Sequence, residues 1–444
     1  MEAANWLARD AAAVWHPFTQ HSSWLGDEPT VVDRAEGPWL FDVDGRRYLD
    51  GVSSLWVTTF GHRTPEIDAA ITAQLARLDH ATFLGATHVP GIELAELLLS
   101  HAPERGDPAQ PQLSKVFYAG DGSSAVEVAL KMAYQHSVQS RARARPLFVH
   151  LREAYHGDTL GAVSVGGIEL FHATYRPLLL RTLAVGSPGL RKPGQSPAER
   201  AAEVVAELEG VMHRDGDQVC AIVVEPMVQA AGGMLTYDAH FLREARRLAT
   251  EHGTLLICDE VATGVGRTGK MWASEHAGIV PDLLTTAKGL TAGYLPLSAV
   301  LATQDVYEAF LGSAESGRTF FHGHTYTANP LCCAAAIANL RLIEERGLVG
   351  QAFELGERLG RQLAPLAADD RVLEVRRIGT MTGVEVRGVG ARTGAAVCRA
   401  ARRRGVWLRP LGDTVILMPP LTLGRDETEL LVGALTESIA EVVS

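Results

Sequence analysis

The 444-residue chain has little cysteine: it contains five, and no two of them form a Cys-x-x-Cys pair. A disulfide framework or a zinc site needs cysteines in another arrangement, so we expect a reducing compartment, the cytoplasm. No stretch reaches the roughly 18 consecutive apolar residues that a membrane-spanning helix needs. The first ten residues carry an acidic side chain at position 2 and have no apolar core, so we expect no secretory signal there.

Basic residues are also in short supply, because 41 lysines and arginines face 52 acidic residues and leave a net charge of −11. Proteins that bind nucleic acid neutralise phosphates with basic side chains, so this balance disfavours a nucleic-acid partner. A local basic pocket for one small anion is compatible with the same net charge. The expected partner is therefore a small molecule, with no nucleic acid and no membrane.

The composition that remains, 46% hydrophobic and 21% charged, is typical of a soluble globular protein. From about residue 115, short apolar runs alternate with helical patterns, and the two clearest buried strands lead into Glu225 and Asp259. This alternation predicts an α/β fold with a mostly parallel sheet covered by helices on both faces. We expect a large domain over 65–330, a smaller α+β domain over 331–444, and an N-terminal segment, 1–64, that joins the smaller one.

Lys288 is the first candidate for a catalytic residue. It is flanked by apolar and small residues and is followed by Gly289. Burial of a lysine lowers the pKa of its amine and favours the neutral form that attacks a carbonyl to give a Schiff base. Taken alone, the residue is better interpreted as a surface lysine at a helix start, since most lysines are exposed.

Two further features change that balance. Asp259 stands at the carboxyl end of a buried strand, where a carboxylate can keep the ring nitrogen of pyridoxal phosphate protonated. Residues 120–124 (Gly-Asp-Gly-Ser-Ser) join a strand to a helix, and amide groups with serine hydroxyls at a helix start can hold a phosphate. Ser123 is also an ordinary helix cap. Together, the lysine, the aspartate and the loop predict a pyridoxal 5′-phosphate (PLP) enzyme.

Two alternatives are weaker. Residues 264–269 match the Gly-x-Gly-x-x-Gly pattern of dinucleotide-binding dehydrogenases, but residues 260–263 lie between the preceding strand and the first glycine, which leaves no tight turn, and no helical pattern follows. The histidines at 16, 156, 322 and 324 lack the spacing of metal ligands, so we interpret them as hydrogen-bonding loop residues and expect no metal site.

The residues from Asp259 to Lys270, with 281–282 and 287–289, resemble the signature of class III aminotransferases, which are PLP enzymes of fold type I. Within that family, several segments are similar to the members that convert 8-amino-7-oxononanoate (KAPA) to 7,8-diaminononanoate (DAPA) in biotin biosynthesis. These segments are 14–20, 155–158, 225–229, 322–325, 409–412 and 417–420. The resemblance extends from about residue 13 to 421 in the family's order.

The resemblance implies a role for each matching residue. Lys288 is the Schiff-base lysine and proton shuttle, Asp259 pairs with the pyridine nitrogen, and Tyr155 stacks on the ring. For the cofactor it further implies Gly122 and Ser123 at the phosphate, Glu225 near O3′, and Thr325 reaching the phosphate of a partner subunit, hence a homodimer with shared sites. For the substrates it implies Arg409 on the KAPA carboxylate, Arg267 near the donor, and Phe18, Trp56 and Gly323 around them.

Three positions depart from the members that use S-adenosylmethionine as amino donor. Phe18 and Ile416 replace tyrosines and Leu55 replaces a tryptophan, which leaves the apolar pattern of relatives that use lysine. S-adenosylmethionine and lysine both remain open as donors. The second hypothesis for the whole protein is an ω-amino-acid:pyruvate aminotransferase, and a lyase or aminomutase on the same fold is the third.

Overall fold

The structure is a computed structural model that describes residues 2–140 and 144–443. These residues form two compact units. Unit 1 holds the described residues up to Thr64, the stretch Glu357–Val375 and those from Thr382 on, and unit 2 holds Pro65–Gly356 and Arg376–Met381. Helix α12 (Pro330–Glu345), which the sequence pattern placed in the C-terminal domain, lies in unit 2 instead, because it packs against α4 (Pro65–Leu75) and α5 (Val89–Ser100).

Unit 2 is built on a seven-stranded sheet with the strand order β4-β12-β11-β10-β7-β5-β6. Strand β12 runs antiparallel to both of its neighbours, and the other neighbouring pairs are parallel. The strands are β4 (Leu113–Ala119), β5 (Leu147–Leu151), β6 (Leu183–Val185), β7 (Val219–Val224), β10 (Leu255–Asp259), β11 (Leu283–Thr286) and β12 (Ser298–Thr303). The prediction of a mostly parallel sheet is confirmed.

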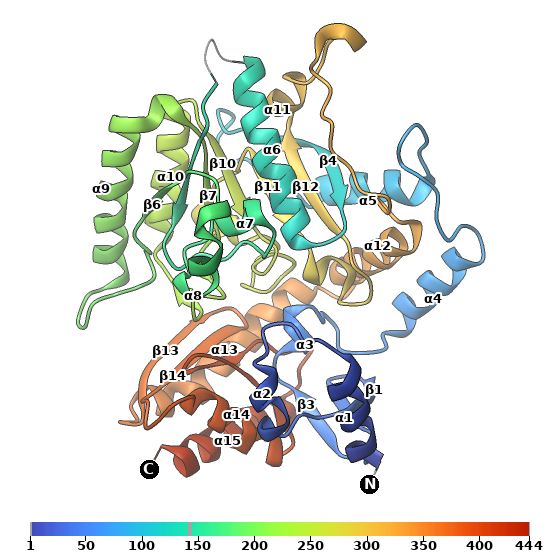
Figure 1. Ribbon diagram of the computed structural model, residues 1–444, viewed down its shortest axis with the longest axis vertical. Coiled ribbons are helices and arrows are strands. Elements are labelled where there is room, and N and C mark those ends of the chain that lie inside the picture. The colour runs from blue at the N-terminus through green and yellow to red at the C-terminus, as the bar shows by residue number, and fades with distance from the viewer. Residues whose placement is uncertain (1, 141–143, 444) are drawn as a thin grey trace. The chain divides into compact units, whose positions relative to one another are not determined.

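Alternate residues of the central strands enter two separate hydrophobic cores, one on each face of the sheet. On β7, Ile222 packs with α9 (Pro197–Asp215) and α10 (Ala239–Glu251), whereas Val223 packs with α6 (Gly122–Ser140). Because a strand covered on both faces needs apolar residues throughout, β7 is fully buried and its sequence is a continuous apolar run. Figure 1 shows α9 and α10 on one side of the sheet and α6 in front of it.

Shorter elements of unit 2 connect these layers. The helices are α7 (Leu160–Ser164), α8 (Glu169–His172) and α11 (Gln304–Glu308), and the strands β8 (Val228–Gln229) and β9 (Leu235–Thr236) form a small hairpin. The 3₁₀ turns are η2 (Ala173–Leu178), η3 (Gly216–Gln218), η4 (Ala273–Ala277), η5 (Lys288–Thr291) and η6 (Ala314–Ser316). Helix α9 starts at a capping box of Ser196 and Glu199, which satisfies amide groups at its first turn.

Unit 1 joins residues from both ends of the chain in one sheet, of order β1-β2-β3-β15. Strand β3 (Arg47–Asp50) pairs in parallel with β15 (Val406–Trp407), and β1 (Val32–Glu36) and β2 (Trp39–Asp42) follow antiparallel. A second sheet has the order β13-β14-β17-β16. Its strands are β13 (Val372–Ile378), β14 (Met381–Val386), β17 (Thr414–Leu417) and β16 (Arg409–Leu411). The expected smaller α+β domain, made by both chain ends, is confirmed.

The helices of unit 1 lie before, between and after these strands. They are α1 (Glu2–Ala13), α2 (His21–Trp24), α3 (Ser53–Trp56), α14 (Thr393–Arg403) and α15 (Arg425–Val442), with the 3₁₀ turn η1 (Leu25–Asp27). Helix α13 (Leu348–Ala367) begins in unit 2 and ends in unit 1. Within the described ranges, no helix has both the length and the apolar character required to cross a membrane.

Candidate active site

Three parallel strands of unit 2 end at one edge of the sheet, and each leads into a residue singled out by the sequence. Glu225 follows β7, Asp259 ends β10, and Lys288 lies two residues beyond β11. The pairing of Asp259 with Thr285 on β11 fixes the register of these ends. Because ligands of parallel sheets bind at the carboxyl ends of the strands, this edge is the candidate active site.

Asp259 is buried and receives three hydrogen bonds. Oδ1 accepts from the Thr285 hydroxyl at 3.0 Å and from the Val261 amide at 3.0 Å, and Oδ2 lies 2.7 Å from Nδ1 of His156. Burial lowers the pKa of His156, but the hydrogen bond to Asp259 and the charge of that carboxylate outweigh it and raise the pKa above the ordinary value. The Asp259 side chain therefore favours the protonated form of the His156 ring.

Glu225 is buried as well and is held by backbone amides. Its Oε1 accepts from the amide of Tyr155 at 3.0 Å, and its Oε2 from the amide of Ala230 at 2.9 Å. Burial raises the pKa of this carboxyl to about 7, although the charge of His156 and the two amides act in the opposite direction. Glu225 consequently changes its charge in the neutral pH range.

Lys288 combines a partly buried position with a backbone φ of 43°. That left-handed conformation is rare for residues other than glycine and costs backbone energy, and such strain gathers at functional sites. Burial lowers the pKa of its amine, the charges of Asp259 and Glu225 raise it, Arg267 lowers it, and the net direction is downward. The fraction of neutral, nucleophilic amine is therefore larger than for an exposed lysine.

The loop between β4 and α6 has the geometry of an anion cradle. At Gly122, the first residue of α6, an added Cβ would lie 2.7 Å from Cγ1 of Val261, so a larger residue would have to displace the Val261 side chain. The Ser123 hydroxyl lies 2.9 Å from that of Thr159 and accepts the Thr159 amide at 3.1 Å. The first turn of a helix presents amide groups without intrahelical partners, and its dipole favours negative charge.

Tyr155 lies four residues before Thr159, the partner of Ser123. Its amide bonds Glu225, its hydroxyl donates to Oδ2 of Asp158 at 2.7 Å, and its ring meets the edge of Phe171 at a centroid distance of 5.9 Å. The hydroxyl bond and the ring contact restrict the orientation of the ring, as a stacking surface requires.

Arg267 is almost fully buried in the glycine-rich stretch 264–269. Its carbonyl accepts the amide and the hydroxyl of Thr380, both at 3.0 Å. The stretch itself folds into turns closed by the Gly269 amide on the Gly266 carbonyl at 3.0 Å, and no α-helix begins there. A dinucleotide site needs a helix at this point, so the dehydrogenase alternative lacks its structural context.

The remaining predicted residues lie elsewhere. Gly323 and Thr325 are on an exposed stretch of unit 2 that leads into α12. In unit 1, Phe18 and Arg409 line one cavity of about 510 Å³, and Trp56 is buried in α3. Ile416 on β17 is the direct antiparallel partner of Arg409, so their side chains emerge on the same face of the sheet.

Comparison with known proteins decides the family. The model of the class III aminotransferase family matches residues 22–439. The chain belongs to the class III aminotransferases. The curated adenosylmethionine-8-amino-7-oxononanoate aminotransferase of Nitratidesulfovibrio vulgaris (strain Hildenborough) is 46% identical over 98% of this chain and 81% of that protein.

Solved structures of class III aminotransferases give the same answer for the fold. The adenosylmethionine-8-amino-7-oxononanoate aminotransferase of Methanocaldococcus jannaschii has a TM-score of 0.92 at 36% identity, with 99% of each chain covered. An amine transaminase from an uncultivated Pseudomonas species, in its PLP-bound form, has a TM-score of 0.89 at 37% identity, with 97% of this chain and 98% of that chain covered.

Class III aminotransferases depend on PLP, and the residues at this edge of the sheet fit that group. The fit rests on a buried carboxylate, an amine with a lowered pKa, and a helix start with a serine hydroxyl, at which Gly122 lets the Val261 side chain pack against the backbone. Buried Nε2 of His156 has no hydrogen-bond partner among the described residues, which leaves one further polar atom inside the site.

Two contributors to this aminotransferase site were missed or misjudged from the sequence. His156 was interpreted as a hydrogen-bonding loop residue, as it is, but its partner Asp259 and hence its place in the site were not predicted; its position between Tyr155 and Gly157 was the available signal. Thr285 was not singled out, and only the register of β10 against β11, which the sequence does not give, places it opposite Asp259.

Proposed function

We propose that this enzyme transfers an amino group to KAPA and forms DAPA in biotin biosynthesis. The observation that carries the proposal is the 46% identity, along 98% of this chain, to a curated adenosylmethionine-8-amino-7-oxononanoate aminotransferase. The cavity of unit 1 lined by Arg409 supports it, since a guanidinium binds a carboxylate such as that of KAPA through two parallel hydrogen bonds.

We infer that Lys288, Asp259, Tyr155, Glu225, Gly122 and Ser123 hold the cofactor. Bound PLP supplies an electron sink for the carbon next to the reacting amine. Asp259 would keep the ring nitrogen protonated, with His156 beside it supporting the carboxylate charge. Tyr155 would cover the ring, Glu225 would stand near O3′, and the first turn of α6 would hold the phosphate.

The amine of Lys288 is proposed as the proton carrier. A general acid–base group works best when its pKa lies close to the operating pH. Burial lowers the pKa of the Lys288 amine and so brings it closer to that pH. It would remove a proton from the carbon that bears the donor's amine and return a proton when KAPA is the acceptor. Arg267, whose charge acts on Lys288, is proposed to stand near the donor.

We infer that Thr325 completes the phosphate site of a partner subunit, with Gly323 beside the substrate, so that two chains share their sites. Phe18 and Trp56 are proposed to line the substrate site together with Arg409. We also propose a cytoplasmic location, which the five free and buried thiols support, because such thiols are typical of reducing compartments.

The test supplies KAPA with S-adenosylmethionine in one reaction and with lysine in another. Mass spectrometry measures the DAPA that each reaction forms. Product with either donor supports the proposal and identifies the donor at once. The names of the relatives favour S-adenosylmethionine, whereas Phe18, Leu55 and Ile416 favour lysine. No product with either donor, from protein that carries PLP, would contradict the proposal.

The second candidate is an ω-amino-acid:pyruvate aminotransferase. It is favoured by the 37% identity and the TM-score of 0.89 to an amine transaminase. The assay that decides uses alanine or β-alanine with pyruvate as acceptor. Turnover there, together with no reaction of KAPA, would place this candidate first.

A further inference from the structure

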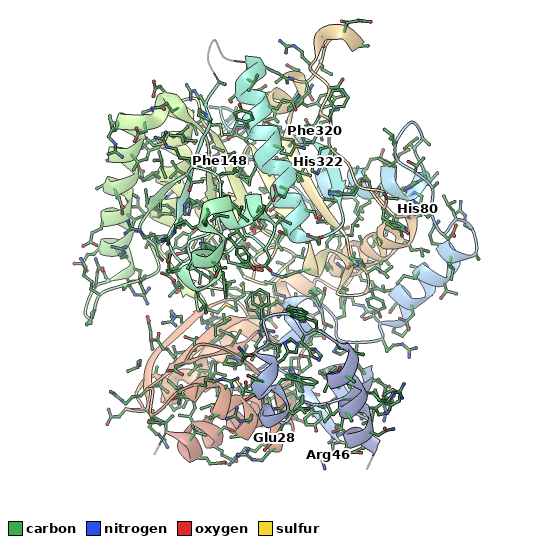
Figure 2. The ribbon with its side chains drawn as sticks, viewed as in Figure 1. Glu28, Arg46, His80, Phe148, Phe320 and His322 are labelled. Carbon is green, nitrogen blue, oxygen red and sulfur yellow. The ribbon has the colours of Figure 1, made fainter. Side chains whose placement is uncertain are left out.

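The exposed segment that carries Thr325 is attached to helix α6 by an unusual pair. Nζ of Lys131, on α6, lies 2.9 Å from Nδ1 of His322, and it also donates to the Phe321 carbonyl at 3.5 Å. Figure 2 labels His322 and Phe320 beside α6. Because an ammonium can only donate, Nδ1 of His322 must be the acceptor, and the imidazole must be neutral for this bond to exist.

The His322 ring is fixed by a cluster of aromatic side chains. It stacks on Phe320 at a centroid distance of 5.6 Å and contacts Phe117 of β4 at 6.3 Å. Phe320 in turn meets Phe117 at 5.5 Å and Phe310 at 5.6 Å. Nε2 of His322 is buried without a hydrogen-bond partner in the described part of the chain. These contacts hold the plane of the ring, and Nδ1 faces Lys131.

A second anchor holds the other side of Thr325. The Thr327 hydroxyl donates to the His324 carbonyl at 2.8 Å and accepts the His324 amide at 3.0 Å. Asn329 then caps α12 by accepting the amide of Leu331 at 3.0 Å. These groups do not titrate near neutral pH. Thr325 thus lies between two anchors. The Thr327 bonds do not depend on pH in this range, whereas the His322 bond requires a neutral ring.

We propose that His322 and Lys131 are positioning residues, which hold Thr325 where it binds the cofactor's phosphate in the partner subunit, and that mild acid releases this hold. The inference rests on the proposed function, because it acts through the role proposed there for Thr325. Neither residue touches the cofactor in this proposal. Their effect is to limit where Thr325 can lie, which lowers the entropy lost when the phosphate is bound.

The surroundings set the pH range. Burial lowers the pKa of His322, the charges of Lys131 and His324 lower it further, and Glu127 on α6 raises it. Phe117, the contact from β4, carries no charge. With a pKa below the ordinary histidine value of roughly 6.5, the ring is neutral at pH 7. The pair is intact there and is lost as the pH falls through the lowered pKa.

The experiment measures the rate at which PLP leaves the holoenzyme between pH 5 and 8, from the change in absorbance as an apo-enzyme scavenger takes it up. His322→Leu and Lys131→Met each remove the bond, and we expect PLP release at pH 7.5 to accelerate about three- to tenfold, the equivalent of one hydrogen bond. His322→Asn keeps an acceptor close to the place of Nδ1 and cannot be protonated in this range. We expect it to release PLP as slowly as wild type and without the acceleration in acid.

Combining the two substitutions sharpens the result. If the residues act as a pair, His322→Leu with Lys131→Met releases PLP no faster than either single variant. His213→Gln is the matched control, because His213 is an exposed histidine whose Nδ1 bonds the Glu209 carbonyl of its own helix, and its release rate should equal that of wild type. Unchanged thermal unfolding of His322→Asn shows that the protein is folded.

Failure of the inference and failure of the function proposed for Thr325 give different results. Thr325→Ala should release PLP faster than wild type at every pH. If it does so while His322→Leu and the pH profile of His322→Asn match wild type, the positioning role is overturned and the role of Thr325 stands. If Thr325→Ala leaves PLP release unchanged, the role of Thr325 is wrong and the positioning role falls with it.

Discussion

Nδ1 of His156 lies 2.7 Å from Oδ2 of Asp259, and both side chains are buried at the carboxyl ends of the parallel strands. The contact joins a loop after β5 to the end of β10, two parts of the chain that are far apart in sequence. It gives the Asp259 carboxylate a hydrogen-bond donor inside the protein, where an unpaired carboxylate would be costly. The aminotransferase therefore has a buried negative charge ready for a protonated ring nitrogen.

Replacing His156 should weaken that charge. His156→Leu is expected to lower kcat about 10- to 100-fold, because a hydrogen bond to a charged group contributes about 1.5–3 kcal/mol. His156→Asn presents an amide donor near the place of Nδ1 and should recover a part of the activity. Steady-state kinetics check this, with PLP content measured in parallel. Equal kcat for the leucine variant and wild type would exclude a role for the contact.

Lys288→Ala should remove the proposed proton carrier while PLP still binds. We expect kcat to fall by about 10²–10⁴ or more, the range that general acid–base groups contribute. Borohydride treatment of wild type should attach the cofactor to the peptide that contains Lys288, and the variant should show no attachment by peptide mass spectrometry. Attachment at another lysine would show that the assignment is wrong.

The raised pKa of Glu225 predicts how stability depends on pH. A carboxyl whose pKa is higher in the folded than in the unfolded state stabilises the fold fully below its unfolded value of about 4.3, and this contribution is lost as pH rises through about 7. Glu225→Gln should therefore flatten the fall in urea-unfolding midpoint between pH 4.5 and pH 7. A wild-type slope retained in the variant would assign the effect to other groups.

Gly122 offers a test of the cradle by steric fit. A Cβ added there would lie 2.7 Å from Cγ1 of Val261, so Gly122→Ala should cost about 1–3 kcal/mol through overpacking and should weaken PLP binding. Gly122→Ala with Val261→Ala removes the opposing methyl groups and should restore a large part of the affinity. PLP titration of apo-enzyme measures both. If the double variant binds no better than the single one, the steric explanation fails.

Donor choice can be tested at two of the three unusual positions. Phe18 is 63% exposed, so Phe18→Tyr adds a hydroxyl with little packing cost, whereas Ile416 is fully buried and Ile416→Tyr has to displace its neighbours. We expect Phe18→Tyr to move the ratio of kcat/KM for S-adenosylmethionine and lysine towards S-adenosylmethionine by about tenfold or less. An unchanged ratio would remove Phe18 from the determinants of donor choice.

Strand ends were readable from the sequence because buried parallel strands are continuous apolar runs, and a charged residue that interrupts such a run stands out. Asp259 and Glu225 were found in that way, and the alternation of strands and helices predicted the sheet. His156 lies in a loop, and its partner Asp259 ends a strand about a hundred residues away in sequence. No local sequence pattern therefore predicts the contact. The placement of α12 likewise depends on packing against α4 and α5, which only the folded chain shows.

The parallel pairing of β3 with β15 sets the order in which a nascent chain can acquire its structure. Val406 must be synthesised before Leu49 finds its partner, so the sheet β1-β2-β3-β15 is completed only when almost the whole polypeptide has left the ribosome. Unit 2 is nearly complete once Gly356 has emerged and can bury its two cores earlier. Pairings of such large sequence separation form slowly, and until they do, the apolar residues of β2 and β3 stay exposed to aggregation and chaperones.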